Sequence, residues 1–360
     1  MSEPRIALVL NSGSSSLKFA AFDLAAPDLR ELVAGQVDPT DGAAAFATID
    51  AALAKAGAPA PASVGHRIVH GGPKLLQHCL VDDAVIRELE RAEPFAPLHV
   101  PQALKLLEAA AARYPGRPQI ACFDTAFHAE MPAIARTLPI PRALRADGIH
   151  RYGFHGLSCE SVVDQLGDQL PGRLIIAHLG NGASVTAVRG GRSVDTSMGL
   201  TPTGGVVMST RTGDLDPGVL IHLMRTLGCG PDELERFLDK DAGMLGVSGR
   251  SGDMRVLHAA AGDANADLAV AMFCRSVAKQ IAAMMVVLGG VDRIVFTGGI
   301  GEHDPSVRRS ICDGLAWAGV CLLDHGEPAS GFTATRAAIM LPSREERQIA
   351  RHVQALVEGR

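Results

Sequence analysis

Seven short segments of the chain carry arginine, histidine or aspartate, and six of them combine these residues with glycine, a combination that can bind anions. The guanidinium of arginine is planar, keeps its charge near neutral pH, and holds a carboxylate or a phosphate through two parallel hydrogen bonds. Each segment alone is compatible with a structural role, such as a core histidine, a surface ion pair or a helix cap. Together they predict a site for anionic ligands, and they are HRIVHGG (66–72), FDTAFH (123–128), RYGFHG (151–156), HLGNGAS (178–184), TRTGDLDPG (210–218), SGRSGDMR (248–255) and FTGGIGEH (296–303).

A further candidate is the N-terminal segment VLNSGSSSLKF (9–19), in which six small polar residues interrupt an apolar run. Small side chains leave backbone N–H groups accessible, glycine permits turns that other residues avoid, and hydroxyls add donors. The segment therefore predicts a phosphate-binding turn, with Lys18 supplying charge and Asn11 orienting a phosphate or a metal-bound water. It is not the GxxxxGK[ST] loop, which is absent from the sequence. A loose serine-glycine hairpin is the simpler alternative.

The elements that would position these segments alternate between strands and helices. Short apolar runs bounded by glycine or asparagine predict strands at Ile6–Leu10, Phe19–Leu24, Leu174–His178, Ser184–Val188 and Arg293–Thr297. Helical patterns cover Pro101–Tyr114, which has proline at its start, and Asp263–Leu288, which is closed by two glycines. This mixture predicts an α/β fold.

Two segments about half a chain apart share one plan. VLNSGSSSLKFAAF from residue 9 and AHLGNGASVTAVRGG from residue 177 each run from an apolar strand through asparagine, glycine and small polar residues into a second strand. A duplicated domain would produce this similarity. Two unrelated hairpins with Asn-Gly turns remain the alternative. A boundary between the two copies is expected near residue 148, after PIPRALR (139–145).

Composition narrows the classes of protein further. A formal net charge of −5 argues against a nucleic-acid binder, and seven scattered cysteines without a CxxC pair predict reduced thiols. Glu3 and Arg5 precede a short apolar run, so no signal peptide is predicted. The most apolar stretch, Ile281–Leu288, is too short to span a bilayer. We expect a soluble cytoplasmic protein with neither a nucleic-acid nor a membrane partner.

The motifs as a set resemble the acetate kinase family, within the superfamily of sugar kinases, actin and heat-shock chaperone ATPases. The resemblance runs from NSGSSSLKF through the segments above to SREE (343–346). It implies two ribonuclease-H-like domains around a central cleft. Residues 1–148 with a returning helix in 343–360 would form the first domain. Residues 149–342 would form a second, nucleotide-binding domain that also makes a homodimer.

The resemblance implies reversible phosphoryl transfer from ATP to acetate, giving acetyl phosphate and ADP. By motif match, Arg67 would bind the acetate carboxylate, and Arg211 and His155 would stabilise the moving phosphoryl group. Asp124 matches the family's catalytic aspartate. Acetate is already ionised at neutral pH, so its attack needs no general base. We therefore expect Asp124 to orient Arg211 or a metal-bound water.

The resemblance also implies cofactor and nucleotide positions. Mg²⁺, or Mn²⁺ in its place, would lie near Asn11 and Glu345. Ser343 fits the N-cap of a capping box in which Glu346 bonds back to the Ser343 backbone, leaving Glu345 for the metal. The nucleotide would contact Lys18, His178, Leu179, Gly180, Asn181, Gly182, Asp253, Met254, Arg255, Gly298, Gly299, Ile300, Gly301 and Glu302.

Substrate size would be set by an apolar wall of Val69, Leu98, Phe154 and Pro202, again by motif match. Valine at the first position leaves little space, and one methylene is worth only ~1–3 kcal/mol. We expect acetate to be preferred and propionate tolerated, with a propionate or butyrate kinase as the nearest alternative. A pyrophosphate-using variant and an ATP-dependent binding protein of the chaperone or actin kind are further alternatives. Gly204 and Gly205 depart from the family pattern and predict altered flexibility near Arg211 or an altered phosphoryl donor.

Overall fold

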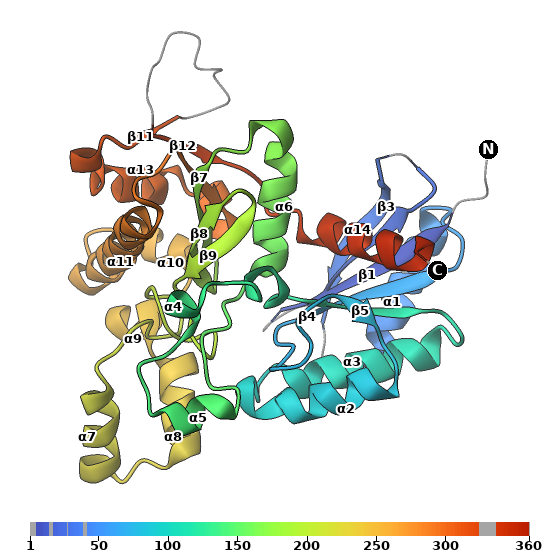
Figure 1. The fold of residues 1–360 in the computed structure, drawn as a ribbon, viewed down its shortest axis with the longest axis horizontal. Helices are drawn as coiled ribbons and strands as arrows, with labels where there is room; N and C mark the ends of the chain where they lie inside the picture. Colours follow the sequence, from blue (N-terminus) through green and yellow to red (C-terminus); the bar gives the residue numbers. More distant parts are fainter. Residues whose placement is uncertain (1–4, 14–16, 27, 39–41, 324–335, 360) are drawn as a thin grey trace. The chain divides into compact units, whose positions relative to one another are not determined.

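Two six-stranded sheets organise the residues that the structure describes. The structure is a computed structural model that describes residues 5–13, 17–26, 28–38, 42–323 and 336–359 (Figure 1). Each sheet belongs to one of two units. Unit 1 comprises Met1–Ala129, Gly156–Ser161 and Arg344–Arg360, and unit 2 comprises Glu130–His155 and Val162–Ser343.

The sheet of unit 1 has the strand order β3-β2-β1-β4-β6-β5. Its central strand β1 pairs antiparallel with β2 and parallel with β4, and β4 pairs parallel with β6. The outer strand β5 runs antiparallel to β6. The strands are β1 (Ile6–Ser12), β2 (Leu17–Asp23), β3 (Arg30–Val37), β4 (Ser63–Ile68), β5 (Cys79–Leu80) and β6 (Gln119–Phe123).

Both faces of this sheet are covered, which explains the uninterrupted apolar run of β1. Ile6, Leu8 and Leu10 face a core shared with α1 (Gly42–Lys55) and α3 (Val100–Arg113). Ala7 and Val9 face the opposite core, which is shared with α14 (Glu345–Glu358). Figure 1 shows α14 lying along these strands although it comes last in the sequence. Helix α2 (Asp83–Ala92) packs against α3.

The sheet of unit 2 has the order β11-β12-β10-β7-β8-β9. Strand β7 pairs antiparallel with β8 and parallel with β10, and β10 pairs parallel with β12. The strands are β7 (Arg173–Leu179), β8 (Ala183–Arg189), β9 (Arg192–Thr196), β10 (Arg293–Thr297), β11 (Cys321–Leu322) and β12 (Ala337–Met340). Thus the predicted strands all exist, with ends shifted by one or two residues at most positions.

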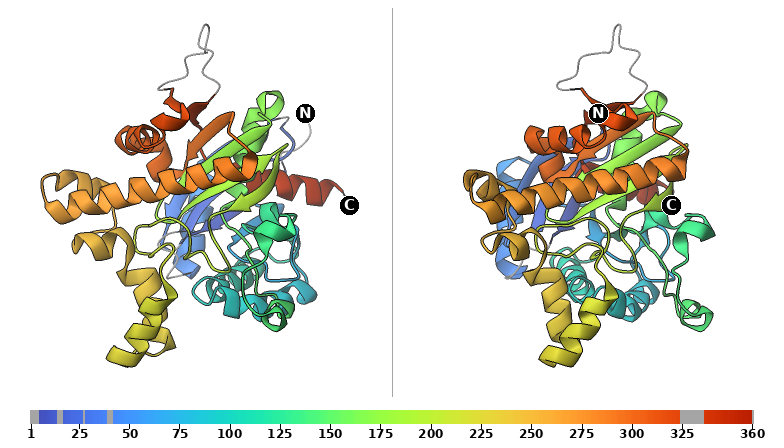
Figure 2. Two further views of the ribbon diagram at one scale, coloured as in Figure 1. Left: turned by 60° about the vertical axis from the view of Figure 1, so that its left-hand side comes forward. Right: turned by 90° about the vertical axis from the view of Figure 1, so that its left-hand side faces the viewer.

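The long helix α11 (Ala264–Leu288) packs on β7, β8 and β9 (Figure 2). It has the predicted ends, because the Asp263 side chain accepts hydrogen bonds from two backbone N–H groups and Gly289 follows in the left-handed conformation. The whole helix is long and apolar enough to cross a membrane, so the length of Ile281–Leu288 alone was too narrow a test. Its buried face includes Phe273, Val277 and Ile281, and 33% of its most apolar stretch is buried inside the structure.

The remaining helices are short. Helix α6 begins in unit 1 and ends in unit 2. The helices are α4 (Ala133–Arg136), α5 (Arg142–Ala146), α6 (Gly156–Leu166), α7 (Pro217–Leu227), α8 (Pro231–Arg236), α9 (Gly243–Ser248), α10 (Met254–Ala259), α12 (Gly298–His303) and α13 (Pro305–Asp313). Single 3-10 turns are η1 (Glu93–Phe95), η2 (Ala126–His128), η3 (Gly167–Gln169) and η5 (Ala316–Ala318), and η4 (Phe237–Asp241) is a π-helical turn.

The two sheets are copies of one plan. Strands β7, β8, β9, β10 and β12 repeat the order and directions of β1, β2, β3, β4 and β6. Even the irregularity is repeated, since the register shifts after Ala21 in β2 and after Ala187 in β8. The outer strands differ, because β11 is parallel to β12 where β5 is antiparallel to β6. The predicted duplication is confirmed, and unrelated hairpins are excluded.

The division between the units does not follow the predicted boundary near residue 148. Residues 130–155 group with unit 2. The Arg151 guanidinium donates to the carbonyls of Thr196, at the end of β9, and of Ser197 and Met198, which follow it, and the Tyr152 N–H donates to the Gly199 carbonyl. These bonds tie the segment to unit 2.

Candidate active site

In unit 1 the candidate residues lie where parallel strands end. Asn11 is near the end of β1, Arg67 is near the end of β4, and Asp124 directly follows β6. These three strands are neighbours and run in the same direction, so their carboxyl ends share one edge of the sheet. The topology therefore gathers residues that are more than fifty positions apart.

Arg67 and Asp124 form a buried ion pair. Nε and Nη2 of Arg67 donate to the same oxygen, Asp124 Oδ2, at 2.9 and 2.6 Å. The Asp124 side chain is 1% exposed and that of Arg67 is 14% exposed. Asp124 Oδ1 is buried and has no hydrogen-bond partner among the described residues. Within unit 1 the aspartate holds Arg67, a partner that the sequence analysis did not name beside Arg211 or a metal-bound water.

The charges around this pair favour a cationic guanidinium. Burial by itself disfavours the charge of Arg67, but the carboxylates of Asp124, Glu345 and Glu346 outweigh it and raise its pKa above the ordinary value. Burial raises the pKa of Asp124 to about 6, against the opposing charge of Arg67. Arg67 is therefore a permanent positive charge, held in place by an acid that can titrate.

Asn11 joins the ion pair to two further acids. Its Oδ1 accepts a hydrogen bond from Arg67 Nη1 at 3.2 Å. Its Nδ2 donates to Glu345 Oε2 at 2.9 Å and to Glu346 Oε1 at 2.8 Å. Glu346 was not among the predicted site residues, although it stands beside Glu345 in the sequence.

The predicted capping box at Ser343 is wrong. Arg344, in the left-handed conformation with φ 43°, immediately precedes α14, and the N–H of Ser343 donates to Glu302 at 2.9 Å. The carboxylate of Glu346 reaches Asn11 instead of the Ser343 backbone. Because of this local geometry both acids face Asn11, rather than Glu345 alone.

In unit 2 the candidate residues gather at the β7–β8 hairpin. His178 near the end of β7 stacks on His155, with ring centroids 4.1 Å apart. The Nδ1 of His155 is 2.9 Å from the hydroxyl oxygen of Ser184, which lies in β8. His155 itself is left-handed, with φ 58°, a conformation that non-glycine residues adopt mainly where the surroundings hold them. Ser184 is a functional neighbour that the HLGNGAS motif contained but sequence reasoning did not single out.

Gly182 brings His155 and Arg211 together. A Cβ atom at Gly182 would lie 3.2 Å from both Arg211 Nη1 and His155 Nε2, so a side chain there would displace one of them. Arg211 is 17% exposed, and its Nη1 donates to the Pro202 carbonyl at 3.3 Å. His155 and Arg211, which were predicted to stabilise the phosphoryl group, thus both lie close to the backbone of Gly182. Such a surface suits an anion.

The loop that carries Arg211 is closed by Asp214. Its carboxylate accepts from the Gly205 N–H at 2.7 Å, and the Asp214 N–H donates back to the Gly205 carbonyl at 2.9 Å. Gly205 has φ 92°, and a Cβ there would lie 2.9 Å from Ser197. Glycine at this position is therefore required by a close crossing of two backbones.

The other predicted nucleotide residues have local structural partners. Glu302 accepts from the N–H groups of Gly298 and Ser343. Asp253 caps α10 and pairs with the exposed Arg255 at 2.6 Å, and Met254 is buried. Leu179 is also buried, whereas Asn181 and Gly299 are exposed and Gly180 and Ile300 are half-buried. Gly298, at the start of α12, and Gly301, further along the same helix, are both buried.

Lys18 is exposed on β2 and pairs with Asn11 in the ladder. Ser14, Ser15 and Ser16 of the predicted phosphate-binding turn lie outside the described residues. The predicted apolar wall is divided between the units. Val69 and Leu98 are half-buried in unit 1, and Phe154 and Pro202 are buried in unit 2.

The predicted residues thus form two clusters. The unit 1 cluster contains the predicted Arg67, Asp124, Asn11 and Glu345 together with Glu346, which was not predicted, and the unit 2 cluster contains His155, His178, Gly182 and Arg211. Comparison with known proteins places them in context. A model described as the "Acetokinase family" matches residues 44–351.

The chain belongs to the acetokinase family.

Individual members agree with this assignment. An acetate kinase of Nitrobacter hamburgensis is 39% identical over 390 aligned residues, which cover 98% of this chain and 96% of the relative. The structure of a propionate kinase from Francisella tularensis aligns with a TM-score of 0.87 and 32% identity, over 97% of this chain and 98% of that one. An acetate kinase from Porphyromonas gingivalis aligns with a TM-score of 0.85 and 32% identity, over 98% and 100%. The acetokinase resemblance and the duplicated α/β fold predicted from the sequence are both confirmed.

Proposed function

We propose that the protein is an acetate kinase that transfers a phosphoryl group reversibly between ATP and acetate. Membership of the acetokinase family makes it a phosphotransferase with a carboxylate acceptor and ATP as the co-substrate. The observation that carries the proposal is the buried, permanently charged Arg67, which Asp124 and Asn11 hold at one edge of the sheet. We assign the acceptor side of the reaction to the unit 1 cluster and the donor side to the unit 2 cluster.

Arg67 is the proposed ligand of the acetate carboxylate. A guanidinium has five N–H donors. Asp124 accepts from Nε and Nη2, and Asn11 and the Ser12 carbonyl accept from Nη1. An incoming carboxylate would accept a hydrogen bond from the second N–H of Arg67 Nη2. It would accept another from Nη1 if the bond between Nη1 and Asn11 breaks. Asp124 is therefore assigned to orient Arg67.

His155 and Arg211 are the proposed stabilisers of the transferred group. A carboxylate oxygen of acetate attacks the terminal phosphorus of ATP and forms the new P–O bond. The bond from that phosphorus to the bridging oxygen breaks, and the electron pair leaves with ADP. No proton has to move, so catalysis depends on positioning and on charge stabilisation. The two side chains that converge over Gly182 supply donors for that charge.

The donor set in unit 1 fits a hard divalent cation. Glu345 and Glu346 contribute carboxylates, and Asp124 contributes the buried Oδ1 that lacks a hydrogen-bond partner among the described residues. Mg²⁺ prefers oxygen ligands and keeps several waters, and Mn²⁺ accepts similar donors. We assign Glu345 to the metal and Asn11 to orienting the two glutamates. When bound, the metal would neutralise phosphate charge.

The remaining nucleotide contacts are proposals from the family motifs. They are Lys18, the turn from His178 to Gly182, residues 253–255, and Gly298 to Glu302. Glu302 has a clear supporting role, because it fixes the backbone of Gly298 through a hydrogen bond of 3.0 Å. The exposed Asn181 and Gly299 leave room for a ligand at both turns.

We further propose a cytoplasmic homodimer formed through unit 2. The outer face of α11 exposes apolar side chains, with Leu268 and Met272 one turn apart and Val286 82% exposed. Light scattering would give the mass in solution. Val286→Glu would be expected to produce a monomer if this face is the interface.

The test of the proposed activity is hydroxylamine trapping with acetate, propionate and butyrate. An acyl phosphate reacts with hydroxylamine to give a hydroxamate, and we expect this product with ATP, Mg²⁺ and acetate. Similarity to a propionate kinase keeps propionate as the second candidate substrate. A higher kcat/KM for propionate or butyrate would reassign the acceptor, and activity with pyrophosphate would reassign the donor. An ATP-dependent binding protein would give no hydroxamate with any acid.

A further inference from the structure

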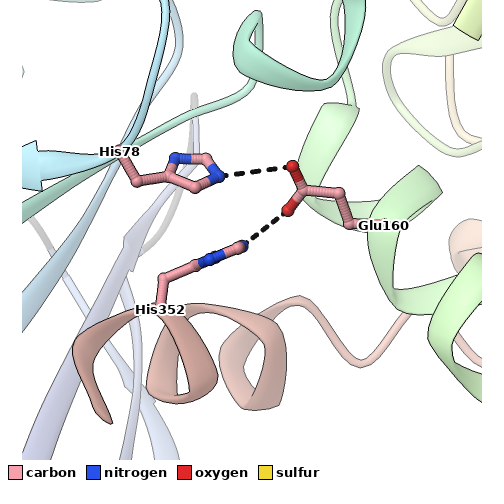
Figure 3. A group of neighbouring side chains, drawn as sticks. All are labelled: His78, Glu160 and His352. Carbon is pink, nitrogen blue, oxygen red and sulfur yellow. Dashed lines mark hydrogen bonds and ion pairs between the residues drawn. The ribbon is translucent and has the colours of Figure 1, made fainter. Parts of the chain in front are cut away.

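A second group of polar side chains lies in unit 1, and the proposed reaction does not use it. Figure 3 shows Glu160 between two imidazoles, with one carboxylate oxygen facing each ring. Nε2 of His78 is 3.3 Å from Glu160 Oε1, and Nε2 of His352 is 2.6 Å from Oε2. The three side chains are 10%, 16% and 23% exposed for His78, Glu160 and His352. They come from the loop before β5, from α6 and from α14.

Two histidines and a glutamate at this spacing resemble a metal site, because their ligand atoms lie within 4.8 Å of one another. The hydrogen bonding at His78 argues against that role. Its Nδ1 accepts a hydrogen bond from the backbone N–H of Phe123 at 3.0 Å. A neutral imidazole that accepts at Nδ1 carries its proton on Nε2. That nitrogen therefore donates to Glu160 and has no lone pair for a metal.

The hydrogen bond from the Phe123 N–H to His78 extends the ladder between β5 and β6 by one bond, in which a side chain is the acceptor. Strand β5 pairs with β6 through Cys79 and Leu80, and Cys79 lies opposite Ala121. The next N–H on this side of β6 belongs to Phe123, beyond the last pair of the ladder. The imidazole of His78 takes the place of a backbone carbonyl there. Phe123 immediately precedes Asp124, so His78 fixes the backbone one residue before the aspartate that holds Arg67.

Glu160 reaches the same aspartate by a second route. It lies in α6, whose first residue, Gly156, donates its N–H to the Asp124 carbonyl at 2.8 Å. A Cβ at Gly156 would lie 2.3 Å from that carbonyl oxygen, so helix and aspartate are in close contact. The contacts form a closed ring from Asp124 through Gly156, Glu160 and His78 to Phe123 and back to Asp124.

We propose that Glu160, held by His78 and His352, is a positioning residue that fixes the backbone on both sides of Asp124 and so aligns Asp124 with Arg67. The negative charge of Glu160 also contributes to the raised pKa of Asp124. The partners of Glu160 are well matched to it, since burial would raise its pKa but the two histidines lower it to about 2. Glu160 is therefore charged throughout the working pH range and keeps both histidines in the donor role.

The inference rests on the proposed function, because it acts through the Arg67–Asp124 pair. The first variant is Glu160→Leu, which has a similar size and no acceptor for either histidine. We expect kcat/KM for acetate to fall about 10- to 100-fold, the range that a small misplacement of a catalytic group produces. The conservative variant Glu160→Gln keeps an acceptor for His78 and should recover most of the loss. Glu358→Gln, which removes an exposed ion pair with Arg5 in the same unit, is the control and should have no effect.

A matched pair at His78 separates the two bonds of the ring. Asparagine can replace Nδ1 as the acceptor for Phe123, whereas glutamine can replace Nε2 as the donor to Glu160. We expect His78→Asn to retain more activity than His78→Gln, because the Phe123 bond lies next to Asp124. Equal activities would remove the direct route through Phe123.

A double-mutant cycle distinguishes positioning from a loss of stability. If Glu160 acts through Asp124, Glu160→Leu should cost less than about twofold when added to Asp124→Asn, since coupled residues are not additive. A lowered unfolding midpoint with unchanged kcat and KM would overturn the proposal. So would stoichiometric Zn²⁺ binding to the wild-type protein that Glu160→Leu abolishes. If Arg67→Ala and Asp124→Asn themselves retain full activity, the proposed active site fails instead.

Discussion

The β1–β2 hairpin of unit 1 and the β7–β8 hairpin of unit 2 occupy the same place in two copies of one fold, yet they present different chemistry. Near the end of its first strand, unit 1 carries Asn11, which is bonded to the side chains of Arg67, Glu345 and Glu346. Near the end of its first strand, unit 2 carries His178, whose ring stacks on His155, and His155 in turn lies against the backbone of Gly182. The hairpin of unit 1 thus lies beside charged side chains, whereas the hairpin of unit 2 has a glycine that leaves room for a ligand. The scaffold fixes where a site lies, and the residues at the strand ends decide what it binds.

The largest effect is expected from Arg67→Ala, which changes the cluster of charged side chains in unit 1. The change removes the proposed carboxylate ligand and leaves Asp124 buried without its partner. We expect kcat/KM for acetate to fall about 10³-fold, comparable to the loss of a strong electrostatic donor. Steady-state kinetics with varied acetate would measure it, with the exposed Arg117→Ala as the control. Retention of wild-type activity would remove Arg67 from the acceptor side.

Asp124→Asn tests the titratable member of the same cluster. The pKa of Asp124 is raised to about 6, so its hold on Arg67 should weaken as the pH falls through that value. We expect the wild-type rate to fall below about pH 6, and the variant to lack this limb and to be about 10²-fold slower. A solvent isotope effect near unity would support orientation, whereas a large one would indicate proton transfer.

The same variant also changes how stability depends on pH. Because the native state raises this pKa, the stability contribution of Asp124 is fully present below its ordinary value of 3.8 and is lost as the pH rises through about 6. Asp124→Asn should therefore reduce the fall in unfolding free energy between pH 4 and pH 6. Denaturant titrations at the two pH values would show it.

Gly182→Ala tests the unit 2 cluster, in which His155 and Arg211 lie against a glycine. The added methyl would lie 3.2 Å from His155 and from Arg211, so at least one of them must move. We expect kcat to fall about 10-fold or more, with a smaller change in KM for acetate. Gly172→Ala is a matched control, since its Cβ would meet only Asp292 at an ordinary 3.7 Å. Equal activities of the two variants would show that the space over Gly182 is not used.

The smallest effect is expected from Arg255→Ala in unit 2. Arg255 is 91% exposed, and its partner Asp253 is a neighbour in sequence that also caps α10. Exposed ion pairs contribute little, so the unfolding midpoint should not change measurably. We expect KM for ATP to rise by less than about fivefold. A larger rise, without a change in KM for acetate, would show that Arg255 binds the nucleotide directly.

The sequence was sufficient for most of the fold because its signals are local. Apolar runs bounded by glycine mark β1, β7 and β10, and Asp263 and Gly289 mark the ends of α11. The duplication was also visible, since the two hairpins share one pattern. Their common bulge was not, because the shifts after Ala21 and Ala187 depend on pairing with β3 and β9.

The sequence identified candidate residues of the site, but it did not identify which of these residues bond to one another. Arg67 and Asp124 were singled out, yet their pairing depends on β4 and β6 being neighbours, which no spacing in the sequence reveals. The capping box at Ser343 followed a sound local rule. It failed because Asn11, more than three hundred residues away, bonds to Glu346. Long-range bonds of this kind decide which polar groups are satisfied, and they depend on the tertiary fold.

Helix α14 makes the folding of unit 1 depend on residues 345–358, which follow its strands β1 and β2 by more than three hundred positions. It covers Ala7, Val9 and Phe22, whose strands are synthesised long before the helix itself. While residues 345–358 are still inside the ribosome, the nascent polypeptide carries an apolar sheet face without its cover, a state prone to aggregation. Glu345 and Glu346 arrive with the same helix. Residues 345 and 346 must therefore be synthesised before the unit 1 cluster can assemble.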